Sequence, residues 1–428
     1  MTEVVIVSGT RTAVGSFGGA LKTISAVELG AVVLNNVLRK VGLCPETDER
    51  SAALAPKAIA QLGLTDLEQR AYDWDNTLQP VAVDEVIIGN VLQAGQGQNP
   101  ARQAMIRAGY PKETPACTVN KICGSGLKAI ALGATAIMAG QAEVVVAGGM
   151  ESMSNAIMAL PKARWGHRME LTGRGEILDL MVFDGLYEIF YGYHMGVTAE
   201  NIARKYGIGR KEQDQLALLS HERALKAIRE GLFAAEIVPV KTRSGKSETV
   251  VDTDERPMET SLEKLARLRP AFAEEGTVTA GNSSGINDGA AAVLMMSKAM
   301  ADSLGLEPLA RITGFASGGV DPAYMGLGPV PAIRRVLQKR GMDICDIDTI
   351  ELNEAFAAQA IGCMRELGLT AEQVNELGSG ISLGHPIGCT GARQMVTALH
   401  QMERRNHASG LISMCIGGGM GMAMLIER

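Results

Sequence analysis

Short apolar runs alternate along the chain with longer stretches whose apolar residues recur at helical spacing. Runs rich in Val and Ile lie within residues 84–90, 143–152, 348–354 and 411–421, and each has the length of a strand. Between them, stretches such as the one that follows residue 126 can continue as helices with one apolar face. Strands that alternate with helices in this way are typical of an α/β fold.

The two halves of the chain repeat the same order of features. In the first half, the strand at 84–90 is followed by a Gly-rich turn at Cys123, a helix, and the strand at 143–152. In the second half, the strand at 348–354 is followed by "GHPIGCTGAR" and then by the strand at 411–421. We therefore predict a duplicated α/β unit.

A different kind of sequence separates these halves. Residues 155–285 contain the aromatic cluster "LYEIFYGYHMG" and two highly charged segments that predict solvated helices. We divide the chain into an N-terminal half (1–154 with 286–307), an inserted loop domain (155–285) and a C-terminal half (308–428). A second insertion is predicted at 45–82, where residues 51–71 have helical periodicity but carry no chemical motif.

Composition argues against several classes of protein. The formal net charge of -6 disfavours a nucleic-acid partner. No apolar run reaches the roughly 18 residues of a membrane span, and a strand is predicted almost at the N-terminus, so we expect no membrane partner and no leader segment. The 7 cysteines are odd in number and form no CxxC pair, which argues against zinc and against disulfides. A cytoplasmic protein in a reducing compartment is predicted.

Cys123 stands where a helix is predicted to begin. It is followed by Gly124, Ser125 and Gly126 and then by the helical run. The first N–H groups of a helix lack intrahelical partners and the helix dipole is positive there, so a thiolate is favoured over a thiol. We therefore predict a lowered pKa for Cys123 and a role as a nucleophile.

Two other interpretations apply to this segment. A lone cysteine is most often a buried core residue. Gly124, Gly126 and Ala129 also fit a relaxed dinucleotide-binding fingerprint. That fingerprint needs an acidic residue at the end of the next strand, whereas Glu143 precedes the next apolar run, which disfavours nucleotide binding.

Polar groups that could serve Cys123 lie in the second half. His385 stands between glycines at a strand-to-helix turn, in the place that Cys123 holds in the first half, and a histidine there can exchange a proton with a thiol. Cys415 ends a strand and precedes glycines 417–419, whose backbone N–H groups suit an oxyanion hole. Asn353 ends another strand, where it could cap a helix or hold a water. The alternatives are a structural histidine and a buried strand cysteine.

Seven motifs together resemble the thiolase family, and most closely its biosynthetic branch. They are "NKICGSGLKA", "GGMESMS", "YHMGVTAEN", "GTVTAGNSSGINDGAA", "NEAFAAQA", "GHPIGCTGAR" and "CIGGGMG", in the order and spacing of that family. The resemblance runs from Val4 to Glu427, except for 45–82. One departure is Ser379, which stands where the family usually has the second glycine of Asn-x-x-Gly-Gly. A serine fits there if the backbone is not left-handed.

The resemblance implies a reversible Claisen condensation of two acetyl-CoA molecules to acetoacetyl-CoA and CoA. Cys123 would take the acyl group and His385 would activate it. Cys415 would be the general base that removes the α-proton of the second acetyl-CoA. His385, with a water held by Asn353, would form one oxyanion hole, and the backbone N–H groups of Cys123 and Gly417 would form the other.

The resemblance also implies the fold, the ligands and the assembly. The fold would have five layers, α-β-α-β-α, with the loop domain covering CoA, and the protein would be a homotetramer built as a dimer of dimers. Its substrates would be acetyl-CoA, acetoacetyl-CoA and CoA, with no metal or redox cofactor. The residues that would line the CoA and acyl path are Leu186, His194, Met195, Ala280, Ser284 and Phe356.

The aromatic residues before His194 favour a short acyl chain. Phe190, Tyr191 and Tyr193 would have to move for a long tail, which is costly in a packed site; alternatively, they only pack the loop domain on the core. Other functions to compare are a broader-chain 3-ketoacyl-CoA thiolase of fatty-acid degradation, a ketoacyl synthase, and a thiolase-like scaffold without catalysis. A ketoacyl synthase needs no second cysteine, and a scaffold needs none of the three residues Cys123, His385 and Cys415.

Overall fold

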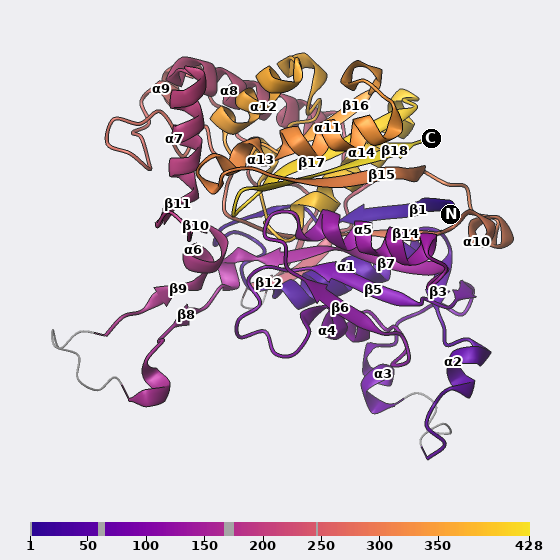
Figure 1. The fold of residues 1–428 in the computed structure, drawn as a ribbon. Helices are drawn as coiled ribbons and strands as arrows, with labels where there is room; N and C mark the ends of the chain where they lie inside the picture. Colours follow the sequence, from indigo (N-terminus) through magenta and orange to yellow (C-terminus); the bar gives the residue numbers. More distant parts are fainter. Residues whose placement is uncertain (1, 59–64, 167–174, 245–246) are drawn as a thin grey trace.

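A ten-stranded mixed sheet forms the centre of the molecule (Figure 1). The computed structural model describes residues 2–58, 65–166, 175–244 and 247–428. The strands lie in the order β16 (Thr349–Leu352), β17 (Ser409–Ile416), β18 (Met420–Glu427), β15 (Ala310–Gly319), β1 (Val4–Arg11), β14 (Asn287–Ser297), β7 (Val144–Ser152), β5 (Glu85–Gly89) and β6 (Ala116–Val119). The short β2 (Gly15–Ser16) pairs with β14.

The two predicted halves meet at one pair of strands. β16 and β17 are parallel, as are β5 with β6 and β5 with β7, and the other neighbours are antiparallel. β1 and β15 are joined only where Val5 faces Arg311 and Ile6 faces Ala310. The half-sheets of the duplicated unit are therefore parts of one continuous sheet.

Helices form three layers around these half-sheets, which gives five layers in all. α11 (Pro329–Arg340) packs on β15 and β18 from outside, and α1 (Ala26–Arg39) and α4 (Pro100–Arg107) cover the outer face of the N-terminal half. α5 (Ser125–Met138) and α14 (Thr390–Arg405) lie between the half-sheets and contact strands of both (Figure 1). Because it is enclosed in this way, α14 is buried from Thr390 to Met402.

Two glycines let the N-terminal ends of α5 and α14 approach closely. A Cβ added to Gly126 would lie 3.0 Å from the backbone N of Ala392, and one added to Gly391 would lie 2.7 Å from Cβ of Leu127. Larger residues at these two positions would push the helices apart. The segments that carry Cys123 and His385, just before the two helices, are thereby brought together.

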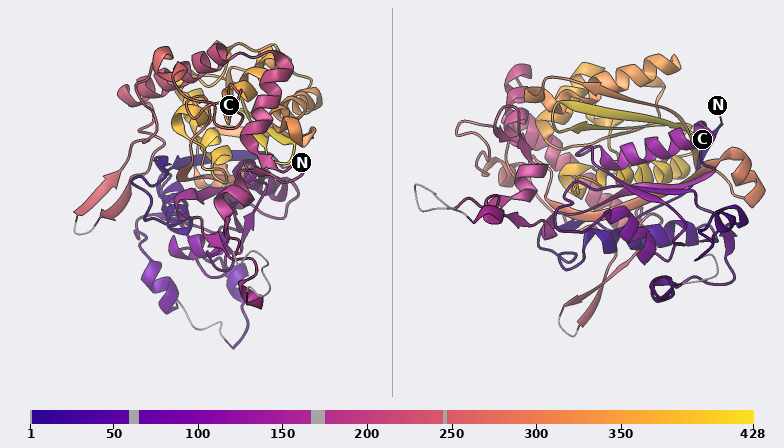
Figure 2. Two further views of the ribbon diagram at one scale, coloured as in Figure 1. Left: turned by 90° about the vertical axis from the view of Figure 1, so that its left-hand side faces the viewer. Right: turned by 60° about the horizontal axis from the view of Figure 1, so that its bottom comes forward.

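Residues 155–285 pack against the C-terminal half. Buried residues of α7 (Met195–Tyr206), including Ala199 and Ile202, share one apolar core with α11 and with α12 (Ala357–Leu367). α8 (Arg210–Arg229) contacts α12 and α13 (Gly380–Leu383). Two hairpins extend from the body, β8–β9 (Met158–Ala159 with Leu178–Asp179) and β12–β13 (Val240–Ser244 with Ser247–Val251), as Figures 1 and 2 show.

Short elements complete the described chain. They are η1 (Met153–Asn155), η2 (Ala163–Trp165), α6 (Leu180–Gly185), β10 (Tyr187–Glu188), β11 (Tyr193–His194), α9 (Leu262–Ala266), α10 (Lys298–Leu304), η3 (Pro322–Leu327), η4 (Ile344–Asp346) and η5 (Ala371–Gln373). In the parts of the chain that the structure describes, no helix is long and apolar enough to cross a membrane.

The insertion predicted at 45–82 is bracketed by two short parallel strands. β3 (Leu43–Pro45) and β4 (Gln79–Val81) pair and so bring the ends of the insertion together. Its helical periodicity gives two short helices, α2 (Glu49–Ala53) and α3 (Asp66–Ala71), the second of which begins at a capping box between Thr65 and Glu68. Residues 59–64 of the predicted helical stretch lie outside the described residues.

Candidate active site

Cys123 lies immediately before the N-cap of α5, as the sequence predicts. The N-cap is Gly124 and the helix begins at Ser125. The side chain of Cys123 is half-buried, and its sulfur accepts hydrogen bonds from the backbone N–H groups of Cys123 itself and of Gly417. The predicted nucleophile and the predicted backbone oxyanion hole thus come together.

The predicted lowering of the Cys123 pKa is wrong for the free protein. Burial of the sulfur among apolar side chains raises the pKa of this thiol to about 11, and the interaction with Glu151 adds to the rise. The N–H groups of Gly417 and Cys123 favour the thiolate but do not offset this desolvation. Cys123 is therefore a thiol at neutral pH, and its activation requires a base.

Cys415 is fully buried near the end of β17, beside Cys123. Burial raises the pKa of Cys415 well above its usual value, and interactions with the thiols of Cys123 and Cys363 raise it further. The chain then turns into β18 through Gly418 and Gly419, both with positive φ. The site therefore holds two neighbouring thiols, of which Cys123 is the more exposed.

A hydroxyl group in the first turn of α14 orients the imidazole of His385. Nδ1 of His385 lies 2.7 Å from Oγ1 of Thr390, which also donates to the carbonyl of Pro386 at 2.9 Å. The hydroxyl has one proton, and the carbonyl can only accept, so Thr390 accepts from Nδ1–H. Nε2 is then unprotonated; it is buried and has no hydrogen-bond partner among the described residues.

Burial also keeps His385 neutral. Desolvation, with a smaller contribution from the charge of Arg393, lowers the pKa of His385 to about 3. The backbone N–H of His385 donates to Oδ1 of Asn287 at 3.0 Å, which holds the loop in place. Nε2 of His385 is therefore an unprotonated acceptor at neutral pH.

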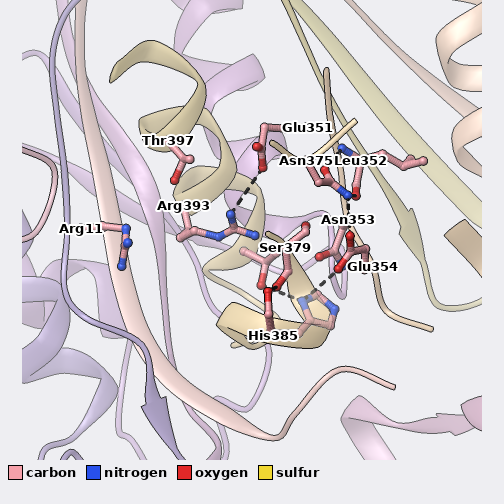
Figure 3. A network of polar contacts seen from close by, with 12 residues as sticks. Arg11, Glu351, Leu352, Asn353, Glu354, Asn375, Ser379, His385, Arg393 and Thr397 are labelled. Atoms are coloured by element: carbon pink, nitrogen blue, oxygen red, sulfur yellow. Dashed lines mark hydrogen bonds and ion pairs between the residues drawn. The ribbon is translucent and has the colours of Figure 1, made fainter. Parts of the chain in front are cut away.

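Asn353 extends β16 toward His385. Its backbone N–H donates to the carbonyl of Ser413 at 2.9 Å, and its Nδ2 lies 3.5 Å from Nδ1 of His385 (Figure 3). The interpretation of Asn353 as a helix cap is wrong, because α12 begins at Ala357 and its N-cap is Phe356. Oδ1 of Asn353 is buried and lacks a partner among the described residues, so the amide is free to bind a small molecule.

Buried polar groups fix the end of β16 behind this amide. The side chain of Asn375 accepts from the N–H of Leu352 at 2.8 Å and donates to its carbonyl at 2.7 Å, and it also donates to Glu354 at 2.9 Å (Figure 3). Ser220 donates to the other oxygen of Glu354 at 2.6 Å. Ser379 has a φ of -150°, so the backbone is extended there and serine fits in place of glycine.

Glu151, in the segment "GGMESMS", links two loops of the site. Its buried carboxylate accepts from Nδ2 of Asn90 at 2.7 Å and from the N–H groups of Val91, Leu92 and Gly388 at 3.0, 3.2 and 2.9 Å. Burial raises the pKa of Glu151 to about 7. The loop after β5 and the loop that carries His385 are therefore tied to one side chain.

Leu186 and Met195 lie next to the predicted nucleophile. The N–H of Met195 donates to the carbonyl of Leu186 at 2.8 Å. Leu186 and Cys123 pack against the same apolar cluster, which includes Ile387. A Cβ added to Gly417 would lie 2.8 Å from the methyl group of Met195, so Met195 stands against the glycine whose N–H reaches the Cys123 sulfur.

Phe272, which no sequence motif indicated, joins His194 to Phe356. The ring of Phe272 stacks on His194 at 4.6 Å and meets Phe356 edge-on at 6.0 Å. The N–H of Ser284 donates to the carbonyl of Ala355 at 2.9 Å, which aligns the loop of Ser284 with Phe356. Ala280 is exposed in the same loop.

Two of the aromatic residues before His194, Phe190 and Tyr191, are largely exposed. Tyr191 is exposed, stacks on Tyr193 at 5.9 Å and donates to Asp321. Phe190 is 71% exposed, although it lies near Gly418. Leu186 and Met195, in contrast, pack beside Cys123 and Gly417.

Sequence could have indicated some of the missed residues. Thr390 and Asn287 lie within "GHPIGCTGAR" and "GTVTAGNSSGINDGAA", so the motifs contained them without revealing their partners. Phe272 follows a charged segment and is far from His194 in the chain, and no local pattern distinguishes it.

Known protein families match the chain over nearly its whole length. The thiolase N-terminal domain matches residues 4–52 and 50–299, and the thiolase C-terminal domain matches residues 306–428. The break between the two N-terminal stretches falls within the insertion predicted at 45–82.

Curated relatives and solved structures agree with these matches. An acetyl-CoA acetyltransferase of Syntrophomonas wolfei is 49% identical over 427 residues, which cover 99% of each chain, and one of Escherichia coli is 50% identical over 430 residues, covering 100% of each. The crystal structure of the Bacillus anthracis acetyl-CoA acetyltransferase superposes with a TM-score of 0.88 at 42% identity, over 100% of this chain and 99% of that one. The predicted fold is confirmed, and the chain belongs to the thiolase family.

Proposed function

We propose that the protein is an acetyl-CoA C-acetyltransferase, which joins two acetyl-CoA molecules to acetoacetyl-CoA and CoA and catalyses the reverse thiolysis. The observation that carries this proposal is the pair of neighbouring thiols, one half-buried beside backbone N–H donors and one fully buried. The names of the relatives support it, because both are acetyl-CoA acetyltransferases that are 49% and 50% identical to this chain over 99% and 100% of its length.

Acyl transfer begins with the Cys123 thiol and the neutral imidazole of His385. The thiol gives its proton to Nε2, and the thiolate attacks the carbonyl carbon of acetyl-CoA. The backbone N–H groups of Cys123 and Gly417, which already contact the sulfur, stabilise the oxyanion. When the C–S bond to CoA breaks, the leaving thiolate takes the proton of Cys415, which leaves an acetyl-Cys123, an imidazolium and a Cys415 thiolate.

The Cys415 thiolate then serves as the base for condensation. Because burial raises the pKa of this thiol well above its usual value, its thiolate is a strong base, as removal of a proton from carbon requires. The enolate of the second acetyl-CoA is stabilised by the His385 imidazolium and by a water held by Asn353. Its carbon attacks acetyl-Cys123, and the departing Cys123 thiolate recovers its proton from His385.

We assign CoA binding to the loop segment 155–285, which includes Ser284, and to Phe356 beside it. His194, Phe356 and Ser284 line the approach to Cys123, together with Ala280, and Phe272 joins this set through its contacts with His194 and Phe356. These reactions need only protein groups and CoA thioesters, so we propose no metal or redox cofactor. We also propose a homotetramer in the cytoplasm.

A short acyl chain is proposed because Leu186 and Met195 close the site beside Gly417. A longer tail would have to displace Met195, which is 8% exposed, and such overpacking costs roughly 1 to 3 kcal/mol. Acetoacetyl-CoA should therefore be cleaved with a much higher kcat/KM than 3-ketoacyl-CoA substrates of ten or more carbons. Equal kcat/KM values across a thiolysis series would favour the broader-chain enzyme instead.

Mass spectrometry after brief exposure to acetoacetyl-CoA, without free CoA, tests the proposal. An acetyl group should appear on Cys123 of the native protein. The Cys123→Ser variant should carry no acetyl group and lose nearly all turnover, because a hydroxyl ionises far less readily than a thiol. An unmodified Cys123 in the native protein, or a serine variant with more than about a tenth of native activity, would contradict this assignment.

A further inference from the structure

The residue before the predicted nucleophile has a backbone conformation that its side chain disfavours. Ile122 has a φ of 46°, in the left-handed region. The other non-glycine residues with positive φ in the described chain are Asn99, Asn375 and Asn406, and asparagine tolerates this region. A β-branched residue does not, so surrounding groups must hold Ile122 in place.

Hydrogen bonds with Asn120 and Ser125 fix the peptide groups on either side of Ile122. Its N–H donates to Oδ1 of Asn120 at 2.9 Å. Its carbonyl accepts from Ser125 twice, from the N–H at 3.0 Å and from the hydroxyl at 2.7 Å. The same hydroxyl accepts from the N–H of Lys121 at 2.8 Å, so it bridges the peptide groups on either side of the turn.

Ser125 has no room to take another position. Its exposed fraction is 0%, and a Cβ added to Gly89, at the end of β5, would lie 2.8 Å from Cβ of Ser125. The hydroxyl has no other hydrogen-bond partner in the described chain besides Lys121 and Ile122. Its one donor proton and one of its two acceptor positions are therefore used on this turn.

The carbonyl that Ser125 holds belongs to the same peptide group as the N–H of Cys123. In a planar trans peptide these two groups point in opposite directions, so fixing the carbonyl fixes the direction of the N–H. That N–H is one of the two donors to the Cys123 sulfur. We propose that Ser125 is a positioning residue, whose hydroxyl holds Ile122 in the left-handed conformation and thereby aims the Cys123 N–H at the reacting thioester oxygen.

This inference rests on the proposed role of Cys123 and predicts a specific rescue. Ser125→Ala removes the hydroxyl and should slow acetylation of Cys123 about 10-fold, because the N–H no longer points at the oxyanion. Adding Ile122→Gly should restore much of the rate, since glycine adopts positive φ without penalty. Adding Ile122→Ala is the matched control: it removes the same side chain but keeps the penalty, so its rate should stay low.

The experiment measures the rate of Cys123 acetylation by rapid quench and mass spectrometry, in the full-length protein. The S125A/I122G variant should acetylate roughly 10-fold faster than S125A/I122A. A native rate in Ser125→Ala, or equal rates in the two double variants, would overturn the positioning role and leave Ser125 as an ordinary first residue of α5.

Thermal unfolding provides a second test that needs neither catalysis nor the Ser125 substitution. Glycine usually destabilises a protein relative to alanine, but at a left-handed position the order is reversed. Ile122→Gly should therefore melt at a higher temperature than Ile122→Ala. If alanine is the more stable, the strain at residue 122 is refuted. If the order holds but native Cys123 is never acetylated, the proposed function fails and the strained turn stands.

Discussion

The two thiols of the site differ in exposure, and that difference assigns them to different steps. Cys123 is half-buried beside backbone donors, whereas Cys415 has an exposed fraction of 0%. A substrate can reach the first directly, while the second can accept a proton only from a group already bound in the site.

Cys415→Ala should separate acyl transfer from carbon–carbon bond formation. The variant should still form acetyl-Cys123, with CoA taking its proton from the His385 imidazolium, but it should lose condensation and the exchange of acetyl-CoA α-protons with deuterated solvent by about 100-fold or more. Mass spectrometry measures the adduct and NMR measures the exchange. Native exchange rates in this variant would place the base elsewhere.

The reactivity of Cys123 in the free protein should rise with pH without levelling off near neutrality. With a pKa of about 11, the thiolate fraction grows about 10-fold for each pH unit between 7 and 10. His385 stays neutral over this range, because burial lowers its pKa to about 3. The rate of alkylation by iodoacetamide, followed on the peptide that contains Cys123, measures this. A plateau below pH 8 would restore the lowered pKa that the helix N-terminus suggests.

Local sequence predicted the position of Cys123 but not the direction of its pKa shift. The place of Cys123 before α5 follows from the Gly-Ser-Gly turn and the helical run. The direction of its pKa depends on how many apolar side chains enclose the sulfur, and these come from segments such as the one around Ile387. A sequence pattern can identify the thiol, but it does not show how far the folded chain removes the sulfur from water, which sets the direction of the pKa shift.

At the scale of elements, the start of α14 determines which nitrogen of His385 carries the proton. Thr390, in the first turn, accepts from Nδ1–H at 2.7 Å and leaves Nε2 as the acceptor. Thr390→Val has almost the same shape but no hydroxyl, so Nδ1 loses its partner and the imidazole loses its fixed orientation.

Thr390→Val should lower kcat about 10-fold with little change in KM, because a hydrogen bond to a buried imidazole is worth roughly 1 to 3 kcal/mol. Thr390→Ser is the matched control, since it retains the hydroxyl and should keep most of the native rate. Steady-state thiolysis of acetoacetyl-CoA measures both. If valine and serine variants behave alike, the hydroxyl does not orient His385.

The elements themselves were largely predictable, because their apolar periodicity reflects burial. The strands predicted within 84–90, 143–152 and 348–354 are present, and the Gly-capped strand predicted at 411–421 is the end of β17 followed by the glycine turn into β18. The duplicated order of strand, turn and helix is visible in the positions of α5 and α14. What could not be predicted is the tertiary geometry between them: the left-handed Ile122, and the stacking of Phe272 on His194. Such contacts join residues that are far apart in the chain or depend on a single backbone angle.

At the scale of the whole molecule, residues 155–285 are packed against the rest of the chain. α7 and α8 share an apolar core and contacts with the C-terminal half, so this segment has no independent centre in the described chain. Arg11 of the N-terminal half also forms buried ion pairs with Glu236 and Asp254 of this segment. We therefore expect it to unfold together with both halves.

The projecting β8–β9 hairpin carries apolar residues that a free surface would not favour. Figure 1 shows it extending from the body, and its exposed fractions are 63% at Met158, 80% at Trp165 and 64% at Ile177. Exposed apolar side chains on a projecting hairpin favour an interface between proteins. Since we propose a homotetramer, we assign the surface to another copy of the chain.

In light scattering, the native protein should therefore have four times the chain mass of 45.2 kDa. The double variant Met158→Asp with Ile177→Asp should have half the mass of the native tetramer, which is the mass of a dimer. Two carboxylates placed in an apolar interface lose hydration without gaining partners, which opposes association. Val250→Asp is the control, because Val250 is 54% exposed on the other projecting hairpin and the same charge there should leave the mass unchanged. A native protein that is monomeric, or a double variant that remains tetrameric, would show that this hairpin does not hold the copies together.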